Sequence, residues 1–436
     1  MRSRRLLLPA ALLLACAVLA AVAFGAGRTP GLDRTYGKEG VVDLTAALAP
    51  AQAPTEGAGE DRLYPYVSAR SFDGTPDGSA YVIAVLADCG ERCANGPHLE
   101  RLDPRGQKDA GFGGADGVAL PRPTGTVRVI SDAAGRPVVA TVSKGTVVVR
   151  RFNLAGRPDR SFGDGGVVKL SCGCFRYPQL RLLRSPGGRI LVDVNTYLAL
   201  AHEPEHTFRS LLYRLLPNGR PDRGFGGTGS VTAKFRQPEL PESVVVDRHG
   251  AILLGGPGCC SRHVYVERIG ADGRPDRKFE RTAASSMRRL SRLGEFPTLA
   301  AALPRPDGGI DIVGTSQARH GYYLRLRADG RLARSFGRRG LMRLPFIVTA
   351  AIRGGDGGIF VAGHTKLYGG YTAFRILSDG RPDPAYGGAQ GISIPTVGLR
   401  AHVASAGRGR VLIFNNGNYF CRSGCAPEPE IARFLE

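Results

Sequence analysis

The sequence predicts an all-β protein, a seven-bladed β-propeller of four-stranded antiparallel units. Three observations predict this fold: one phrase recurs seven times along the 436 residues, each recurrence opens a series of four short strand-like segments, and the two chain ends together complete one repeat. A unit of roughly 50 to 75 residues cannot bury its apolar face alone, so recurrence at that period indicates stacked supersecondary units.

The phrase is clearest in the third and fourth units, as Gly156-Arg-Pro-Asp-Arg-Ser-Phe-Gly163 and Gly219-Arg-Pro-Asp-Arg-Gly-Phe-Gly226. Further copies begin at Gly31, Gly106, Gly273, Gly330 and Gly380. We place one propeller domain at 31–436, with units near 32–102, 109–152, 159–215, 222–269, 276–326, 333–376 and 383–435.

Four strands are expected in each unit. In the third unit they are 166–170, 179–183, 189–194 and 211–216, short runs rich in Val, Ile and Leu that are bounded by Gly or Pro. Gly-rich turns join the second strand to the third, as in Ser185-Pro-Gly-Gly188, and provide the positive φ that tight hairpins need. Each unit therefore reads as an antiparallel meander, and seven of them in a ring make a propeller with short, protected edges.

The two chain ends supply complementary parts of one repeat. The chain enters at the phrase, and its last residues, 431–435, match the fourth strand of a unit. The ends are therefore expected to close the ring, either by sharing a blade or by packing one blade on another.

The residue types of the phrase suit a structural role. Gly permits a turn, Pro fixes φ, and Asp accepts hydrogen bonds from nearby backbone amides. The aromatic residue that follows is expected to be buried as a wedge between blades. A repeated ligand or calcium site is the alternative, but a feature present in every unit favours the scaffold. The structural motif residues are Phe112, Phe162, Phe225, Phe279, Phe336, Tyr386, Asp159, Asp222, Asp276 and Asp383.

The phrase resembles the bacterial delta-60 repeat, a propeller-type repeat of secreted and surface proteins. Units three and four match its pattern closely, whereas Glu280 and Arg281 replace the glycines after Phe279, and Leu332 and Ala333 replace Pro and Asp in the sixth unit. The resemblance covers Gly31 to Glu436 and implies the architecture. It implies no catalytic residue, because the family pattern names none.

Residues 1–26 have the features of an export signal. Arg2, Arg4 and Arg5 precede an apolar run from Leu6 to Phe24 that ends near a small-residue cleavage pattern. We therefore expect a secreted or cell-envelope protein. An uncleaved membrane anchor is the alternative, since the apolar run could just span a bilayer.

The formal net charge of +21 comes mostly from arginine, much of it inside the repeated phrase. Structural pairing of motif Arg with Asp is one interpretation, and attraction to anionic cell-envelope polymers or lipid head groups is the second. The third interpretation is a protein partner on the loop-rich face. Specific nucleic-acid binding is not expected. The protein is expected to be a monomer.

Eight cysteines beyond Cys16 form four local pairs, which suits an exported protein. Cys89 with Cys93 and Cys421 with Cys425 occupy equivalent loops, and we expect both pairs to be bridged. For the remaining residues, Cys172, Cys174, Cys259 and Cys260, a strained vicinal bridge, cross-pairing and soft-metal binding all stay open.

All the irregular loops are expected on one face of the disc, opposite the phrase and the tight turns, so we expect the ligand there. His202-Glu203-Pro204-Glu205-His206 satisfies a zinc-hydrolase motif, but Pro204 interrupts the helix that this chemistry needs. We predict no catalytic residue, no cofactor and no metal site. The leading hypothesis is a binding or scaffold module, and the alternative is a lactonase- or lyase-like propeller enzyme that uses the central funnel.

Overall fold

The computed structural model describes residues 31–48, 66–87, 96–123, 126–174, 178–198, 207–234, 241–257, 264–288, 298–316, 320–365, 371–393, 401–407, 409–415 and 429–436. The expected signal segment lies outside these ranges. Within them, no helix has the length and apolar character needed to cross a membrane.

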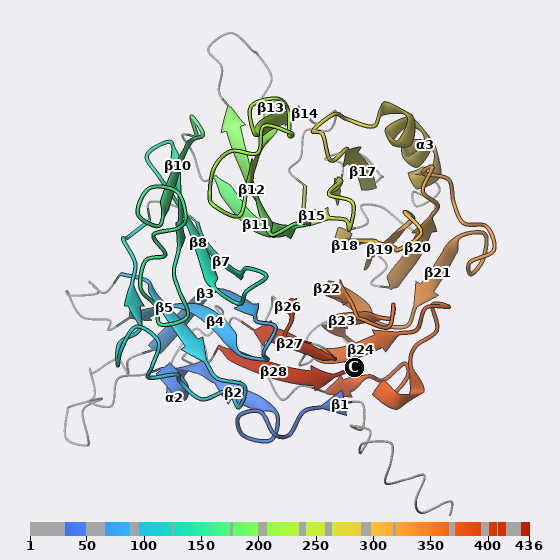
Figure 1. Cartoon of the computed structure of the whole chain (residues 1–436). Helices are drawn as coiled ribbons and strands as arrows, with labels where there is room; N and C mark the ends of the chain where they lie inside the picture. Colours follow the sequence, from blue (N-terminus) through green and yellow to red (C-terminus); the bar gives the residue numbers. More distant parts are fainter. Residues whose placement is uncertain are drawn as a thin grey trace, which may run out of the picture.

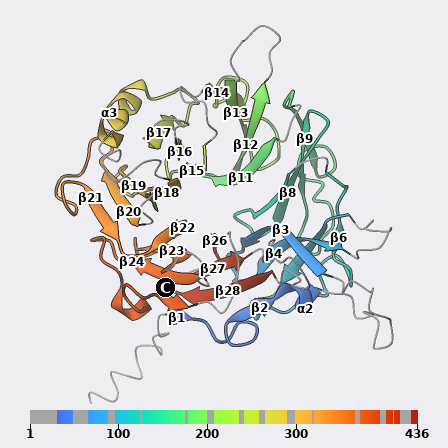
Figure 2. The ribbon, with the colours of Figure 1, turned by 180° about the vertical axis from the view of Figure 1, so that it is seen from behind.

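Seven antiparallel sheets stand radially around one centre (Figure 1), and the view from behind shows the same ring (Figure 2). The fold is nearly all-β, so the predicted seven-bladed propeller is confirmed. We number the blades 1 to 7 in chain order. Their innermost strands, β3, β7, β11, β15, β18, β22 and β26, contact one another in succession around the ring.

The first three blades have four strands each, named here from the centre outward. Blade 1 consists of β3 (Tyr66–Gly74), β4 (Ala80–Ala87), β5 (His98–Leu102) and β6 (Val118–Ala119). Blade 2 consists of β7 (Val127–Ser131), β8 (Pro137–Ser143), β9 (Thr146–Arg151) and β10 (Val167–Ser171). Blade 3 consists of β11 (Gln179–Ser185), β12 (Arg189–Leu198), β13 (Thr207–Leu215) and β14 (Ser230–Lys234).

The remaining blades vary in their outer parts. Blade 4 has β15 (Ser243–Val246), β16 (Ile252–Pro257), β17 (Val264–Ile269) and the helix α3 (Arg277–Met287). Blade 5 has β18 (Thr298–Pro304), β19 (Ile310–Thr315), β20 (Gly321–Leu326) and β21 (Leu341–Leu344). Blade 6 has β22 (Ile347–Arg353), β23 (Ile359–His364), β24 (Thr372–Ile376), the short 3-10 helix η2 (Pro384–Tyr386) and β25 (Ile392–Ser393).

Blade 7 closes the ring with both ends of the described chain. Its strands β26 (Ala401–Ser405), β27 (Arg410–Asn415) and β28 (Glu430–Leu435) come from the C-terminal part. The N-terminal strands β1 (Gly31–Leu32) and β2 (Val41–Asp43), which precede the short helix α2 (Leu44–Leu48), both pair with β28. The ends therefore share one blade, which settles the alternative left open by the sequence.

The repeated unit and the blade are offset by one strand. In the third unit the first strand, β10, pairs with β9 of the preceding unit, while the other three strands belong to blade 3. The prediction that one unit forms one meander is therefore wrong in phase. The physical reason is that the compact phrase turns the chain back beside the strand it has just left, and only the next connection leads inward to a new blade.

The fifth unit replaces its first strand with α3. Asp276 caps this helix by accepting a hydrogen bond from the N–H of Phe279 at 2.9 Å. Glu280 continues the helix where other units have a glycine turn, and Phe279, Ala283 and Met287 bury one helical face. The sheet of blade 4 consequently has three described strands.

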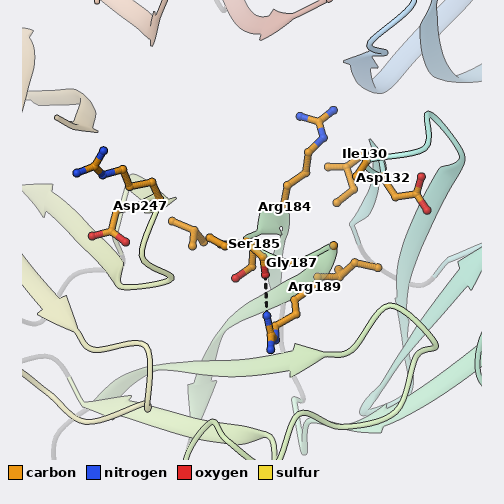
Figure 3. A pocket seen from close by; sticks show the side chains of 13 residues that line it. Ile130, Asp132, Arg184, Ser185, Gly187, Arg189 and Asp247 are labelled. Carbon is orange, nitrogen blue, oxygen red and sulfur yellow. Dashed lines mark hydrogen bonds between the residues drawn. The ribbon is translucent and has the colours of Figure 1, made fainter. Parts of the chain in front are cut away.

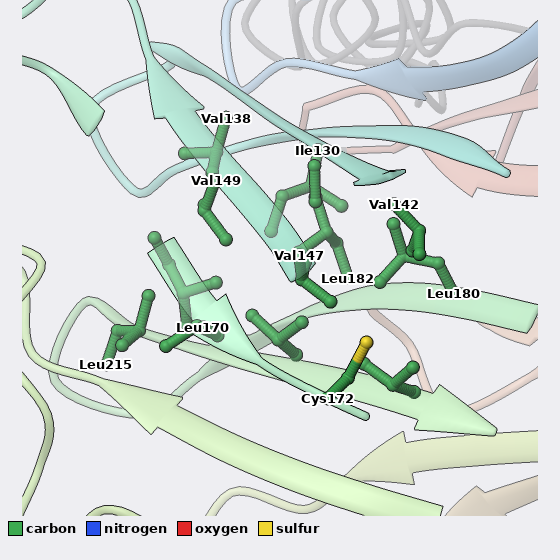
Figure 4. Close-up of a cluster of buried hydrophobic side chains, with 14 of the residues drawn as sticks. Ile130, Val138, Val142, Val147, Val149, Leu170, Cys172, Leu180, Leu182 and Leu215 are labelled. Carbon is green, nitrogen blue, oxygen red and sulfur yellow. The ribbon is translucent and has the colours of Figure 1, made fainter. Parts of the chain in front are cut away.

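Seven separate apolar clusters fill the spaces between neighbouring blades. Figure 4 shows the cluster between blades 2 and 3, where Val142 and Val147 lie beside Leu180 and Leu182. Each cluster contains one aromatic residue of the phrase, buried to 5% exposure or less: Tyr36, Phe112, Phe162, Phe225, Phe279, Phe336 and Tyr386. The aromatic residues therefore lie where a wedge between blades would lie.

Candidate functional site

A strand arginine holds the phrase of the third unit in place. Arg151, at the end of β9, donates from Nε to Asp159 Oδ2 at 2.9 Å, and its guanidinium carbon lies 4.6 Å from the centre of the Phe162 ring. The same side chain donates to the backbone carbonyl of Pro217, in the turn of the next unit. One arginine thus joins the carboxylate, the aromatic wedge and the neighbouring blade.

The same arrangement recurs around the ring. The pairs are Arg101–Asp109, Arg214–Asp222, Arg268–Asp276, Arg375–Asp383 and Arg433–Asp33. Arginines also lie over the aromatic rings of the phrase in units one, four, five, six and seven. The predicted structural Asp residues are therefore engaged in ion pairs, which is what a scaffold role requires.

The sixth unit departs from this pattern because Ala333 stands where the other phrases have Asp. Its strand arginine, Arg325, donates instead to Asp311 of the neighbouring strand β19 at 2.8 Å. Arg353 donates to the other oxygen of Asp311 at 2.7 Å. A fully buried carboxylate in the sheet has replaced the carboxylate of the phrase.

The carboxylates of Asp222 and Asp159 remain ionised at neutral pH. Burial alone would raise the pKa of Asp222, but the N–H of Gly224 and the charge of Arg214 outweigh burial and hold that pKa below its usual value. The pKa of Asp159 is lowered in the same way, by Ser161 and Arg151 against burial. Such carboxylates are poor proton donors at neutral pH.

The first glycine of the phrase allows adjacent phrases to touch. Gly219 has φ of +81°, and a Cβ there would lie 2.8 Å from the backbone nitrogen of Gly163. That nitrogen donates to the carbonyl of Asn218 at 2.8 Å, which joins the third phrase to the fourth. A side chain at Gly219 would both strain the backbone and break this contact.

Among the predicted cysteine sites, only Cys172 and Cys174 fall within the described residues. They are bonded to each other as a local disulfide, with their Cα atoms 5.1 Å apart. Cross-pairing of these two with Cys259 and Cys260, and soft-metal binding by the four, are therefore excluded, because the local bond uses both thiols. Lying outside the described residues are Cys89, Cys93, Cys259, Cys260, Cys421 and Cys425.

The metal motif at 202–206 also lies outside the described residues. Within the part of the chain that the structure describes, no group of three or more His, Cys, Asp or Glu side chains could hold a metal ion. Most of the irregular loops that were expected to contact a ligand also lie outside the described residues. Ligand binding on that face therefore stays a prediction.

A cavity of about 370 Å³ lies between three hairpins on the opposite face, that of the phrase and the tight turns. One hairpin joins β7 to β8, the second joins β11 to β12, and the third joins β15 to β16. Figure 3 shows the side chains from these hairpins that line the cavity. Apolar walls come from Ile130, Pro186, Ile190 and Val246, and the charged groups are Asp132, Arg184, Arg189, Asp247 and Arg248.

Most of these charged groups already have partners. Arg189 donates from Nε to Asp222 at 2.9 Å, and Asp132 accepts from the side chain of Arg136. Arg184 reaches past blade 2 to pair with the buried Asp73 of blade 1, and it also donates to the carbonyl of Ser131 at 2.7 Å. The cavity is therefore a recess with apolar walls, and its charged groups are mostly paired with other groups of the protein.

A second set of polar groups lies on the inner strands. Arg181 of β11 donates to the fully buried Asp193 of β12 at 3.2 Å, and Asn195 and Ser210 donate to the same carboxylate. Burial raises the pKa of Asp193, against the opposing effect of Arg181. Within the residues that the structure describes, Arg128, at the equivalent position of β7, donates only to its own strand, to the carbonyl of Val127 at 2.9 Å.

The repeated phrase also contains exposed arginines. One follows the first glycine and another follows the Asp, and in several units neither has an acidic partner among the described residues. In the third and fourth units these arginines are Arg157, Arg160, Arg220 and Arg223, and the sixth unit adds the exposed Arg334, Arg338 and Arg339 at other positions. By contrast, exposed Arg381 pairs with Asp379 at 2.7 Å.

No family model matches the chain, and no curated protein matches it either. Among solved structures, the polysaccharide lyase Uly1 aligns with a TM-score of 0.51 and 10% identity, over 94% of this chain and 98% of its own. The BP39L lectin from Burkholderia pseudomallei aligns with a TM-score of 0.50 and 12% identity, over 85% of this chain and 96% of its own. At such low identity these likenesses establish the fold alone.

The strand arginines were missed at the level of sequence, although a signal for them exists. In five units an arginine stands eight residues before the phrase Asp, as Arg151 does before Asp159 and Arg214 before Asp222. The residues of the cavity and of the inner strands carry no comparable signal, because each occurs in only one or two blades.

Proposed function

We propose that the chain is a secreted or cell-envelope binding module whose phrase face takes an anionic polymer. The observation that supports this most is the set of exposed phrase arginines that have no acidic partner among the described residues. The buried strand arginines pair with the phrase carboxylates, whereas the exposed arginines of the phrase are available to an outside ligand.

The geometry suits a polymer better than a small molecule. Arg157 and Arg160 of one phrase and Arg220 and Arg223 of the next belong to adjacent units whose phrases are hydrogen-bonded to each other. Exposed charges that recur along a rigid rim add weak attractions, each modest and screened by salt. An extended polyanion can engage several of them at once.

The test compares binding of the full chain to polygalacturonate and to neutral dextran at several salt concentrations. We expect binding to polygalacturonate only, weakening as NaCl rises, because the attraction is electrostatic. Replacing the unpaired arginines at 157, 160, 220 and 223 by Gln should weaken binding about tenfold.

The matched control removes four exposed arginines that already have carboxylate neighbours, at 274, 277, 331 and 381. This control has the same net charge as the first variant and should bind more tightly than it. Equal weakening in the two variants would show attraction to net charge alone. Fragmentation of the polymer by the wild-type protein would favour the enzyme class instead.

A further inference from the structure

Arg128 is a half-buried cation whose charge is not balanced within the described chain. It is the second residue of β7, on the inner strand of blade 2. Its one hydrogen bond goes to the backbone carbonyl of Val127, and no described carboxylate forms an ion pair with it.

The nearest charged group makes the imbalance larger. Arg181 occupies the equivalent position on β11, the inner strand of the next blade, and β7 and β11 are in contact. Burial, and then the charge of Arg181, lower the pKa of Arg128. Arg181 itself is balanced by Asp193, so the uncompensated charge belongs to Arg128.

A guanidinium group does not escape this cost by losing its proton, because its pKa stays too high. A partly desolvated charge without a partner is unfavourable, and proteins usually neutralise it by pairing. Arg128 retains several N–H donors that have no described acceptor, in the planar arrangement that matches the oxygens of a carboxylate or phosphate.

We propose that Arg128, on the inner strand β7 next to β11, binds an oxyanion, either a carboxylate or a phosphate group. Arg128 supplies the donors, whereas the charge of Arg181 is already paired with Asp193. The site lies near the start of both strands, towards the face that carries the Cys172–Cys174 bridge. It is thus separate from the phrase face and does not depend on the function proposed above.

The experiment measures the melting temperature of the full chain in chloride buffer, with 10 mM phosphate or 10 mM succinate added at constant ionic strength. Millimolar concentrations keep the general salting-out effect small. An anion that binds only the folded state should raise the wild-type melting temperature by about 2 °C or more. Phosphate and succinate separate the two kinds of oxyanion, and a response to either one supports the site.

Arg128→Met keeps the apolar part of the side chain and removes the charge, and Arg128→Gln serves if the first variant folds poorly. We expect both to lose the anion response without melting lower than the wild type in chloride. Arg150→Met is the matched control, since Arg150 is also half-buried and donates to Thr141 rather than to a carboxylate. Its anion response should equal that of the wild type.

Three results would overturn the proposal. The first is a wild-type protein that responds to neither anion, and the second is an Arg128→Met protein that responds as strongly as the wild type. The third is an Arg128→Met protein that melts more than about 2 °C below the wild type in chloride, because this would show that Arg128 already has a stabilising partner.

Discussion

Among single residues, the phrase aromatics show most clearly how one position serves the whole ring. Phe225 is fully buried between blades 3 and 4, and Arg214 lies over its ring at 4.6 Å. The side chain therefore contributes apolar contact to two blades and a favourable surface for a buried cation.

Phe225→Ala should lower the free energy of unfolding by about 3 to 5 kcal/mol, because it leaves a cavity between two sheets. Urea denaturation measures this change. Leu154→Ala is the control, since Leu154 belongs to a phrase turn but is 51% exposed, and it should change stability little. A Phe225→Ala protein that melts within about a degree of the wild type would show that the phrase serves a ligand rather than the fold.

The ionisation of Asp222 makes the free energy of unfolding depend on pH. Its pKa in the folded protein lies below the usual 3.8, so its contribution to stability is complete above that value and is lost as the pH falls through the lower, folded-state pKa. Asp222→Asn should lower the free energy of unfolding at pH 7 by about 3 kcal/mol and should flatten its decline below about pH 4. Unfolding curves from pH 7 to pH 2 test this, and an unchanged acid dependence would contradict it.

At the level of elements, the sequence was sufficient for strand positions and for the number of blades, because alternating apolar runs and glycine turns are local signals. The one-strand offset between unit and blade was not predictable, since β10 has strands on either side in the chain with which it could pair. The helix α3 had a partial signal in Glu280, but the loss of a glycine does not by itself specify a helix.

The candidate site was less predictable than the fold. The position of Arg128 on a strand could be expected, but the lack of a balancing carboxylate depends on which blades come together. In a chain rich in arginine, one uncompensated residue has no distinguishing sequence pattern. The Cys172–Cys174 bond could not be chosen from spacing alone either, because several pairings were compatible with one face.

In blade 5, a carboxylate of the sheet takes the place of the missing carboxylate of the phrase. Asp311 pairs with both Arg325 and Arg353 in a fully buried position. Asp311→Asn should lower the free energy of unfolding by about 3 to 5 kcal/mol, because two arginines lose their counter-charge. Adding Ala333→Asp to that variant should recover part of the loss, since it restores the carboxylate that other phrases provide. Wild-type stability in Asp311→Asn would contradict this account.

For the whole molecule, closure depends on residues from opposite ends of the chain. Asp33 and Arg433 form a buried pair at 2.8 Å between Nη2 and Oδ2, and Arg433 also lies 4.4 Å from the centre of the Tyr36 ring. The same contacts that join neighbouring units elsewhere thus join the first unit to the last. A ring closed in this way provides a rigid platform for exposed charges on its faces.

We propose that the arginine, aspartate and aromatic residue act together to hold the ring closed in the six units that have all three, and a double-mutant cycle at this closing pair tests it. Stabilities of the wild type, Asp33→Asn, Arg433→Met and the double variant would be measured by urea denaturation. We predict a coupling energy of about 2 to 3 kcal/mol, because either single change leaves a buried charge unpaired. Single effects that add to within about 0.5 kcal/mol would contradict the claim.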